Sequence, residues 1–251
     1  MNIKNQQELI REHHPEVIKE RLNRLKKPNL ISDAVLGGID GCVTTFAVVS
    51  GALGAGFSSS VALVLGFANL IADGFSMAVS NYESIKAQQD YTDSVRLDEQ
   101  EHIDKIPVGE EEEIRQIFHK KGFTGDVLDK IVETIISDKN LWIDTMLTEE
   151  HGLQQNNLNP LKSGATTFTA FIFVGTVPLL PFLVPSLENN IQFVISASLA
   201  GLMFFLIGAM KSHLFSKPVL SSGLKTLLTG GIAASLAYMT GYILKVVFGI
   251  T

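Results

Sequence analysis

The sequence contains a single cysteine, Cys42, among its 251 residues. One cysteine excludes disulfides within the chain and excludes zinc or iron–sulfur sites built from several thiolates. The sequence also lacks the Gly-x-Ser-x-Gly, Gly-Lys-Thr and His-Glu-x-x-His motifs of hydrolases, nucleotide-binding loops and metalloproteases. Any pumping by this chain must therefore draw on an ion or proton gradient, or on another subunit.

Charged residues are almost missing from five hydrophobic stretches. Each is close to the ~20 residues that a helix needs to cross ~30 Å of hydrocarbon. The five stretches are residues 34–56, 61–81, 165–184, 191–210 and 226–244. This pattern predicts an all-α integral membrane protein with five transmembrane helices.

The first two stretches each retain one charged residue, Asp40 and Asp73 respectively. A charged side chain at bilayer depth costs roughly 2.5–3.5 kcal/mol on insertion scales, so it usually faces a bundle interior or an ion path. A structural hydrogen bond is the competing explanation for each aspartate. We expect Asp40 and Asp73 to line a transport pathway.

Basic residues indicate the orientation, because short loops rich in lysine and arginine stay cytoplasmic. The links at residues 57–60 and 185–190 have none. Basic residues instead precede the first stretch and lie between the fourth and fifth: Lys19, Arg21, Arg24, Lys26 and Lys27, then Lys211, Lys217 and Lys225. We expect the N-terminus and the segment after the second stretch to be cytoplasmic, and the C-terminus to lie across a cell or organelle membrane.

The N-terminal residues are polar and lack the apolar core of a secretory signal, so we expect them to be retained. Residues 8–27 have apolar side chains at helical spacing, which predicts one amphipathic helix, ended by Pro28. It could lie on the cytoplasmic lipid surface or be a solvated lead-in helix. The expected organisation is residues 1–32 with this helix, 33–83 with two spans, 84–163 as an insert and 164–251 with three spans.

The insert, residues 84–163, has 17 acidic and 9 basic residues, a net charge of −8 against −6 for the whole chain. This acidity excludes a nucleic-acid interface there.

Pro107 should end the helix that continues from the second span. Gly109, the Gly122/Gly125 pair and Asp138 with Asn140 should mark the ends of three shorter helices. Their apolar positions suffice for a small core: Ile114, Ile117, Phe118, Val127, Leu128, Ile131, Ile135, Leu141 and Leu147.

Two further patterns concern the spans. Gly37 and Gly41 form a Gly-x-x-x-Gly pair, which lets helices approach closely in lipid. Pro178 and Pro181 predict a kink or an unwound turn in the third span.

In the second span, Asp73, Met77 and Asn81 recur at every fourth residue and so share one helix face. A hard carboxylate beside a soft thioether suits a borderline divalent transition metal better than sodium or calcium. Ordinary packing is the alternative for Met77.

The insert has a second set of candidate metal ligands at helical spacing. Glu99 with His102 and Glu110 with Glu113 are i, i+3 pairs, which project together from one helix face. Glu-x-x-His is also the ligand pair of di-iron helical bundles. Met146 stands three residues before Glu149 and four before Glu150, whereas we expect His119 and His151 to be surface or capping residues. A solvated acidic surface is the alternative.

Several motifs together resemble the vacuolar iron transporter family over almost the whole chain from about residue 30. They are residues 33–41 (DAVLGGIDG), 76–78 (SMA), the run from Pro107 to residues 121–122 (KG), 144–146 (DTM) with 150–152 (EHG), and 178–181 (PLLP). The resemblance implies a five-span homodimer that exchanges cytosolic Fe²⁺, and often Mn²⁺, for protons. It also implies a metal-binding helical insert between spans two and three.

The resemblance implies metal positions at Asp40 and Met77 in the membrane. In the insert it implies ligands at Glu99, Glu110, Glu113, Met146 and Glu150. Two positions depart from the family pattern, because Asn81 and His102 stand where glutamates are expected. Asp73 would replace the carboxylate lost at Asn81, and His102 remains a competent ligand.

The sequence thus predicts a transporter that moves Fe²⁺ out of the cytosol in exchange for protons, with Mn²⁺, Zn²⁺ and Co²⁺ as other candidate ions and no permanently bound cofactor. Two alternatives remain at this point. One is a membrane-anchored protein whose insert buffers or senses iron. The other is an enzyme that oxidises Fe²⁺ at the Glu-x-x-His cluster.

Overall fold

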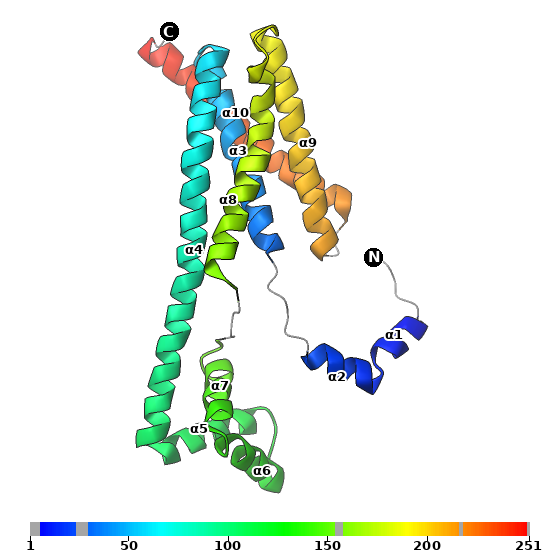
Figure 1. Cartoon of the computed structure of the whole chain (residues 1–251), viewed down its shortest axis with the longest axis vertical. Coiled ribbons are helices and arrows are strands. Elements are labelled where there is room, and N and C mark those ends of the chain that lie inside the picture. The colour runs from blue at the N-terminus through cyan, green and yellow to red at the C-terminus, as the bar shows by residue number, and fades with distance from the viewer. Residues whose placement is uncertain (1–5, 24–29, 154–157, 216–217, 250–251) are drawn as a thin grey trace. The chain divides into compact units, whose positions relative to one another are not determined.

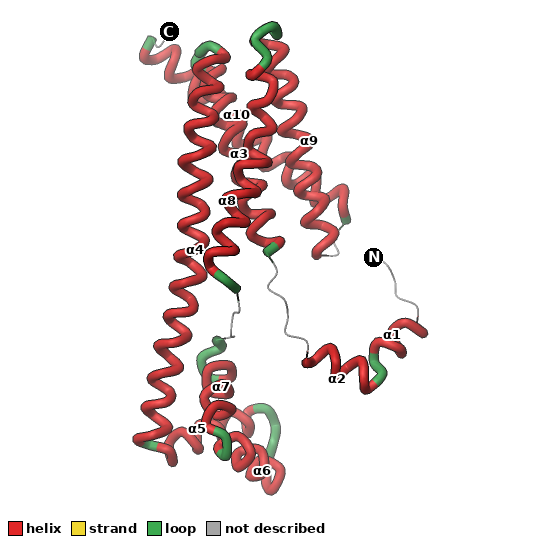
Figure 2. The backbone as a smooth tube through the Cα atoms, in the orientation of Figure 1, coloured by secondary structure: helices red, strands yellow, loops and turns green. Residues whose placement is uncertain are grey.

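The computed structural model describes residues 6–23, 30–153, 158–215 and 218–249, and these residues form helices joined by loops, with no strand among them (Figure 1, Figure 2). Contacts divide the chain into two compact units. The membrane unit comprises Met1–Tyr82 and Leu161–Thr251, and the insert unit comprises Glu83–Pro160. Helix α4, Ser59–Lys105, contributes residues to both units.

Five helical segments of the described chain are long and apolar enough to cross a membrane. They are Ile31–Gly54 (α3), Ser59–Lys105 (α4), Pro160–Leu183 (α8, Pro160–Thr176, with the 3₁₀ helix η1, Val177–Leu183), Asn189–Ser212 within α9 (Asn189–Phe215) and Val219–Phe248 (α10). The predicted number of such segments is confirmed, and each overlaps one of the five predicted stretches.

Glycines bring α3 against α8 at backbone distance. A methyl group on Gly37 would lie 2.2 Å from the carbonyl oxygen of Thr167, and one on Gly41 would lie 2.4 Å from that of Phe171. Such approaches have room for glycine alone. The close packing predicted from the Gly37/Gly41 pair is therefore present.

The two prolines of the third span end regular α-helix, as predicted. Helix α8 stops at Thr176 and the chain continues as η1. The Ser196 hydroxyl donates to the Pro178 carbonyl at 2.7 Å, and the Gln192 amide donates to the Val184 carbonyl at 2.9 Å. The Ser196 hydroxyl thus serves a carbonyl at the point where the prolines interrupt the α-helical pattern, and Gln192 adds a second donor to the Val184 carbonyl, which also accepts from the Leu187 N–H.

The N-terminal region contains two helices where one was predicted. Helix α1 spans Gln6–Glu12 and α2 spans Pro15–Asn23. Proline lacks an N–H and disfavours helical backbone in the residue before it, so Pro15 begins a new helix. Residues 24–29, which include Arg24, Lys26, Lys27 and Pro28, lie outside the described part.

In the insert unit, α4 is followed by α5 (Pro107–Lys120), α6 (Gly125–Ile136) and α7 (Lys139–Glu149). Helix α4 ends at Lys105, just before Pro107, as expected, and Pro107 begins α5. Asp138 caps α7 by accepting from the backbone N–H of Asn140 at 2.9 Å. Gly122, with φ +98°, lies between α5 and α6. The expectation that Gly109 marks a helix end is wrong, because it lies in the first turn of α5.

The insert unit has its own hydrophobic core. Ile114, Val132, Met146 and Leu147 are almost fully buried in it. Most of the predicted apolar positions contribute, but Val127 and Leu141 are exposed. This core fixes the helix ends from which the polar side chains of the candidate site project.

Candidate metal centre

Four glutamates and two histidines gather in the insert unit, and we call them the acidic cluster: Glu99, His102, Glu110, Glu113, Glu150 and His151. Glu99 and His102 lie one turn apart near the end of α4, and the break before Pro107 places Glu110 and Glu113 in the first turns of α5. Glu150 caps the C-terminal end of α7. Three helices therefore supply the cluster.

Two glutamates of the acidic cluster are deeply buried. Glu99 is 4% exposed and Glu110 is 2% exposed. The Oε2 atom of each has no hydrogen-bond partner among the described residues. An unsatisfied buried polar group costs about 1–3 kcal/mol, and more when charged, so these oxygens are suited to accept a proton or a cation.

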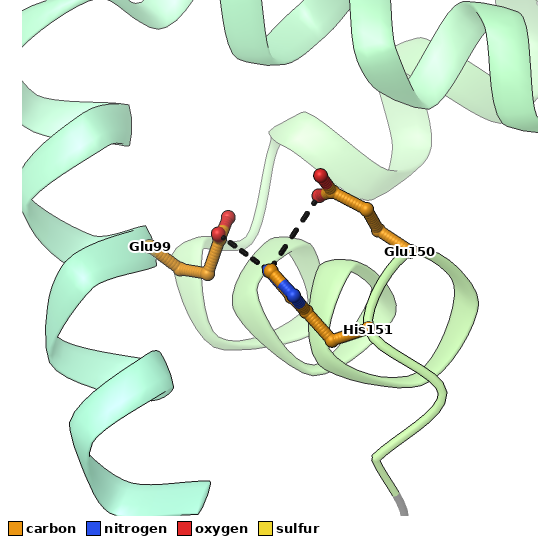
Figure 3. Close-up of side chains that lie close together, drawn as sticks. All are labelled: Glu99, Glu150 and His151. Carbon is orange, nitrogen blue, oxygen red and sulfur yellow. Dashed lines mark hydrogen bonds and ion pairs between the residues drawn. The ribbon is translucent and has the colours of Figure 1, made fainter. Parts of the chain in front are cut away.

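Glu99, Glu150 and His151 form one group with metal-ligand spacing, their potential ligand atoms lying within 4.8 Å of one another. The imidazole of His151 lies between the two carboxylates (Figure 3). Its Nε2 atom is 2.9 Å from Glu99 Oε1 and 3.7 Å from Glu150 Oε2. Both carboxylates therefore converge on one nitrogen.

A second group of three, within the same 4.8 Å limit, consists of Glu99, His102 and Glu110. His102 Nδ1 lies 3.6 Å from Glu110 Oε1, too long for a good hydrogen bond. Glu99 belongs to both groups, so the two histidines stand beside a shared buried carboxylate. Imidazole nitrogen with carboxylate oxygen is a donor set that suits divalent iron and zinc.

Burial and the crowding of negative charge raise the pKa of two glutamates of the acidic cluster. Burial is the main cause that raises the pKa of Glu110 to about 7; repulsion from Glu113 and Glu99 adds to it, and His102 opposes it. Burial, followed by repulsion from Glu113, also raises the pKa of Glu150, against the effect of His151. A divalent cation would offset this repulsion, and protons compete with it for the same oxygens.

The remaining predicted insert residues lie in three different surroundings. Glu113 lies close enough to Glu110 and Glu150 for its charge to repel theirs, and so belongs to the cluster. Met146 is fully buried in the hydrophobic core of the insert unit. Glu149 forms an ion pair with Lys121 at 2.5 Å and is in neither metal-spaced group.

In the membrane unit, Asp40 of α3 and Asp73 of α4 are partly buried and close enough for their charges to repel each other. Met77, one turn beyond Asp73, packs against a core cluster that includes Leu70 and Phe171. The packing alternative for Met77 thus has a structural basis, and Asp40 and Asp73 form a pair of like charges on two spans.

Asn81 makes structural hydrogen bonds that the sequence did not reveal. Its amide nitrogen donates to Asp33 Oδ1 at 3.0 Å and to Thr167 Oγ1 at 2.8 Å. Asp33 is 8% exposed, and its Oδ2 atom has no partner among the described residues. The amide of Asn81 can donate a hydrogen bond to Asp33. An ionised carboxylate at position 81 could only accept and could not make this bond.

Comparison with known proteins places the chain in a family. The model of the VIT family matches residues 31–242, which include both spans with aspartates and the whole acidic cluster. The chain belongs to the VIT family. It is 31% identical to a vacuolar iron transporter of Toxoplasma gondii over 87% of this chain and 76% of that protein. It is 28% identical to one of Plasmodium berghei, over 94% and 90%, and 27% identical to vacuolar iron transporter 1 of Arabidopsis thaliana, over 95% and 93%.

Members of the VIT family are transporters and not enzymes. This agrees with the absence of hydrolase and nucleotide-binding motifs from the sequence. The alternative that the chain is an enzyme oxidising Fe²⁺ is therefore not supported.

Sequence reasoning missed two residues of this VIT-family chain. His151 is exposed and directly follows the C-cap of α7, as expected, but that expectation did not include the contact of its ring with buried Glu99. Asp33 was noted only as part of a motif, yet it is buried against Asn81. Helical spacing finds neighbours on one helix, whereas both of these contacts join different parts of the chain. The adjacent Glu150-His-Gly152 and Asp33-to-Gly41 motifs were the available signals.

Proposed function

We propose that this chain is an integral membrane transporter that moves Fe²⁺ out of the cytosol in exchange for protons. The observation that carries the proposal is the Asp40–Asp73 pair, two mutually repelling carboxylates on adjacent spans of a VIT-family chain. Two carboxylates on neighbouring spans are suited to hold either a divalent cation or protons. The names of the curated relatives support iron as the transported metal.

The acidic cluster is the proposed collection site for metal on the cytosolic side. Its buried carboxylate oxygens, which have no partner within the described part of the chain, and its two imidazoles offer ligands for Fe²⁺, with Mn²⁺, Zn²⁺ and Co²⁺ as further candidates. Metal then passes to Asp40 and Asp73. Met77 is the proposed soft contact beside this pair, and Asn81 contributes by holding Asp33.

The proposed organisation keeps residues 1–32 and the insert, residues 84–163, in the cytoplasm, with the C-terminus across a cell or organelle membrane. Support comes from the basic residues before α3 and from the links at residues 57–60 and 185–190, which have none. Five spans are few to enclose an ion path alone, so we propose a homodimer.

The experiment that tests this function is Fe²⁺ uptake by purified protein in liposomes with an imposed pH gradient. Asp40→Asn removes the charge at nearly constant size and should abolish uptake. Asp126→Asn, the same substitution at an exposed position of α6, is the matched control and should transport like the wild type. Full uptake by Asp40→Asn contradicts the proposal.

The rival candidate is a membrane-anchored protein in which the insert buffers or senses iron. The compactness of the insert unit and its buried carboxylates favour this rival. The double variant Glu99→Gln/Glu110→Gln separates the two functions. A transporter should retain weakened Fe²⁺ uptake, because the membrane path is intact. Iron binding by wild-type protein without any uptake would favour the rival.

A further inference from the structure

We propose that His151 is a metal ligand which, with Glu99 and Glu150, forms a mixed nitrogen–oxygen site that strengthens the preference of the insert for Zn²⁺ and Fe²⁺ over Mn²⁺. This inference rests on the proposed function of the acidic cluster and adds to it a ligand and a basis for metal choice. Helical spacing did not indicate His151, which follows the end of α7.

Geometry is the first support. Glu99 Oε1 and Glu150 Oε2 approach the same His151 nitrogen at 2.9 and 3.7 Å (Figure 3). Ligand atoms of one tetrahedral zinc ion, each about 2.0–2.2 Å from the metal, lie roughly 3.4 Å apart. Small side-chain rotations therefore suffice for a single cation to contact all three residues.

The state of Glu99 is the second, independent support. Its side chain is 5% exposed, and its bond from His151 engages Oε1 only. Oε2 is buried without a partner among the described residues. A hydrogen bond that served structure alone would leave this oxygen unsatisfied, whereas a cation in the group would compensate the buried carboxylate.

The donor type determines the metal preference. The affinity of a given site for divalent metals rises from Mn²⁺ through Fe²⁺ to the later metals of the first transition row. Imidazole nitrogen suits Zn²⁺ and Fe²⁺, whereas carboxylate and water oxygens suit Mn²⁺. His151 adds a nitrogen to a set that otherwise consists of carboxylates. Removing its imidazole should therefore weaken Zn²⁺ binding more than Mn²⁺ binding.

The test compares His151→Gln with His119→Gln in full-length protein in detergent. His119 is an exposed histidine of α5 in the same insert and is in neither metal-spaced group, so it is the matched control. Dissociation constants for Zn²⁺ and for Mn²⁺ are measured by calorimetry. We expect His151→Gln to lower the ratio of Zn²⁺ to Mn²⁺ affinity by at least about tenfold, and His119→Gln to leave it unchanged. An equal ratio in both variants overturns the proposal.

Pulsed electron paramagnetic resonance of bound Mn²⁺ reports the ligand directly through coupling to imidazole nitrogen. In a His102→Gln background, His151 is the remaining histidine of the two metal-spaced groups. The nitrogen signal should persist in that background and disappear when His151→Gln is added. A signal that is unchanged by His151→Gln contradicts ligation.

A measurement on the wild type does not depend on the folding of any variant. Diethylpyrocarbonate modifies free imidazoles, and mass spectrometry locates the products. Zn²⁺ should protect His151 and leave His119 reactive, whereas equal modification of His151 with and without Zn²⁺ overturns the proposal. If Fe²⁺ uptake is absent while this protection is seen, the transport function fails and the His151 site stands.

Discussion

Glu110 illustrates at the residue scale what burial does to a carboxylate of the insert. Its pKa is raised from an ordinary value of 4.5 to about 7, with Glu113 and Glu99 adding repulsion and His102 opposing it. Between these values Glu110 is more protonated in the folded protein than in the unfolded chain. The free energy of unfolding of the metal-free protein should therefore rise as the pH is lowered from 8 through 7 towards 5.

Trp142 makes this prediction measurable in the intact protein. It is the single tryptophan of the chain and is buried in the core of the insert unit, so its fluorescence reports unfolding of that unit. Glu110→Gln should reduce the pH dependence and raise the Tm at pH 8. Glu133→Gln, at an exposed position of α6, should do neither. A wild-type Tm that falls on acidification from pH 8 to pH 6 contradicts the account.

Asn81 supports a second prediction at this scale. Asn81→Asp keeps the size but replaces the donor to Asp33 with a second carboxylate, so it should destabilise the membrane unit by about 1–3 kcal/mol. The double variant Asp33→Asn/Asn81→Asp restores an amide–carboxylate pair and should recover much of the loss. Thermal unfolding in detergent at pH 8 measures both. Equal stability of Asn81→Asp and the wild type would show that the hydrogen bond to Asp33 is unimportant.

At the scale of elements, the sequence predicted those features whose causes are local. A long apolar stretch with at most one charged residue can cross lipid wherever it occurs, which is why all five candidate membrane helices were found. Pro107 and Asp138 act on the adjacent backbone, so they correctly marked the starts of α5 and α7. Gly109 misled, because one glycine is tolerated in the first turn of a helix.

Features that depend on tertiary contacts were harder to predict. Buried Glu99 contacts His151, which is 52 positions away in the sequence. Buried Asp33 contacts Asn81, which is 48 positions away. Helical periodicity carries no information at that range. The charged clusters were therefore located approximately, while their internal partners required the structure.

The contact of α3 with α8 gives a prediction at the element scale. In Gly41→Ala the new methyl would meet a backbone carbonyl 2.4 Å away, and backbone cannot rotate aside. Overpacking of this kind costs about 1–3 kcal/mol, so the Tm should fall. In the control Gly231→Ala of α10, the methyl would meet no described atom within 4 Å, and stability should stay equal or rise. Thermal unfolding in detergent compares them, and equal Tm values for the two variants would contradict the close packing.

At the scale of the whole molecule, Cys42 is the single cysteine and is buried, so an introduced cysteine can be labelled selectively. The proposed orientation predicts that Asp126→Cys in the insert reacts with a membrane-impermeant maleimide only after the cytosolic side is opened. Ser58→Cys, in the exposed link after α3, should react from the opposite side. Labelling of both from the same side would contradict the proposed orientation.

The coupling of metal to protons is the central claim, because it assigns Asp40 and Asp73 their joint role. It is tested most directly by recording Fe²⁺ entry and internal pH together in the same proteoliposomes, with an iron-sensitive and a pH-sensitive dye. We predict that adding external Fe²⁺ makes the lumen more alkaline as iron enters, and that Asp40→Asn abolishes both signals. Entry of Fe²⁺ without any change in internal pH would contradict proton exchange.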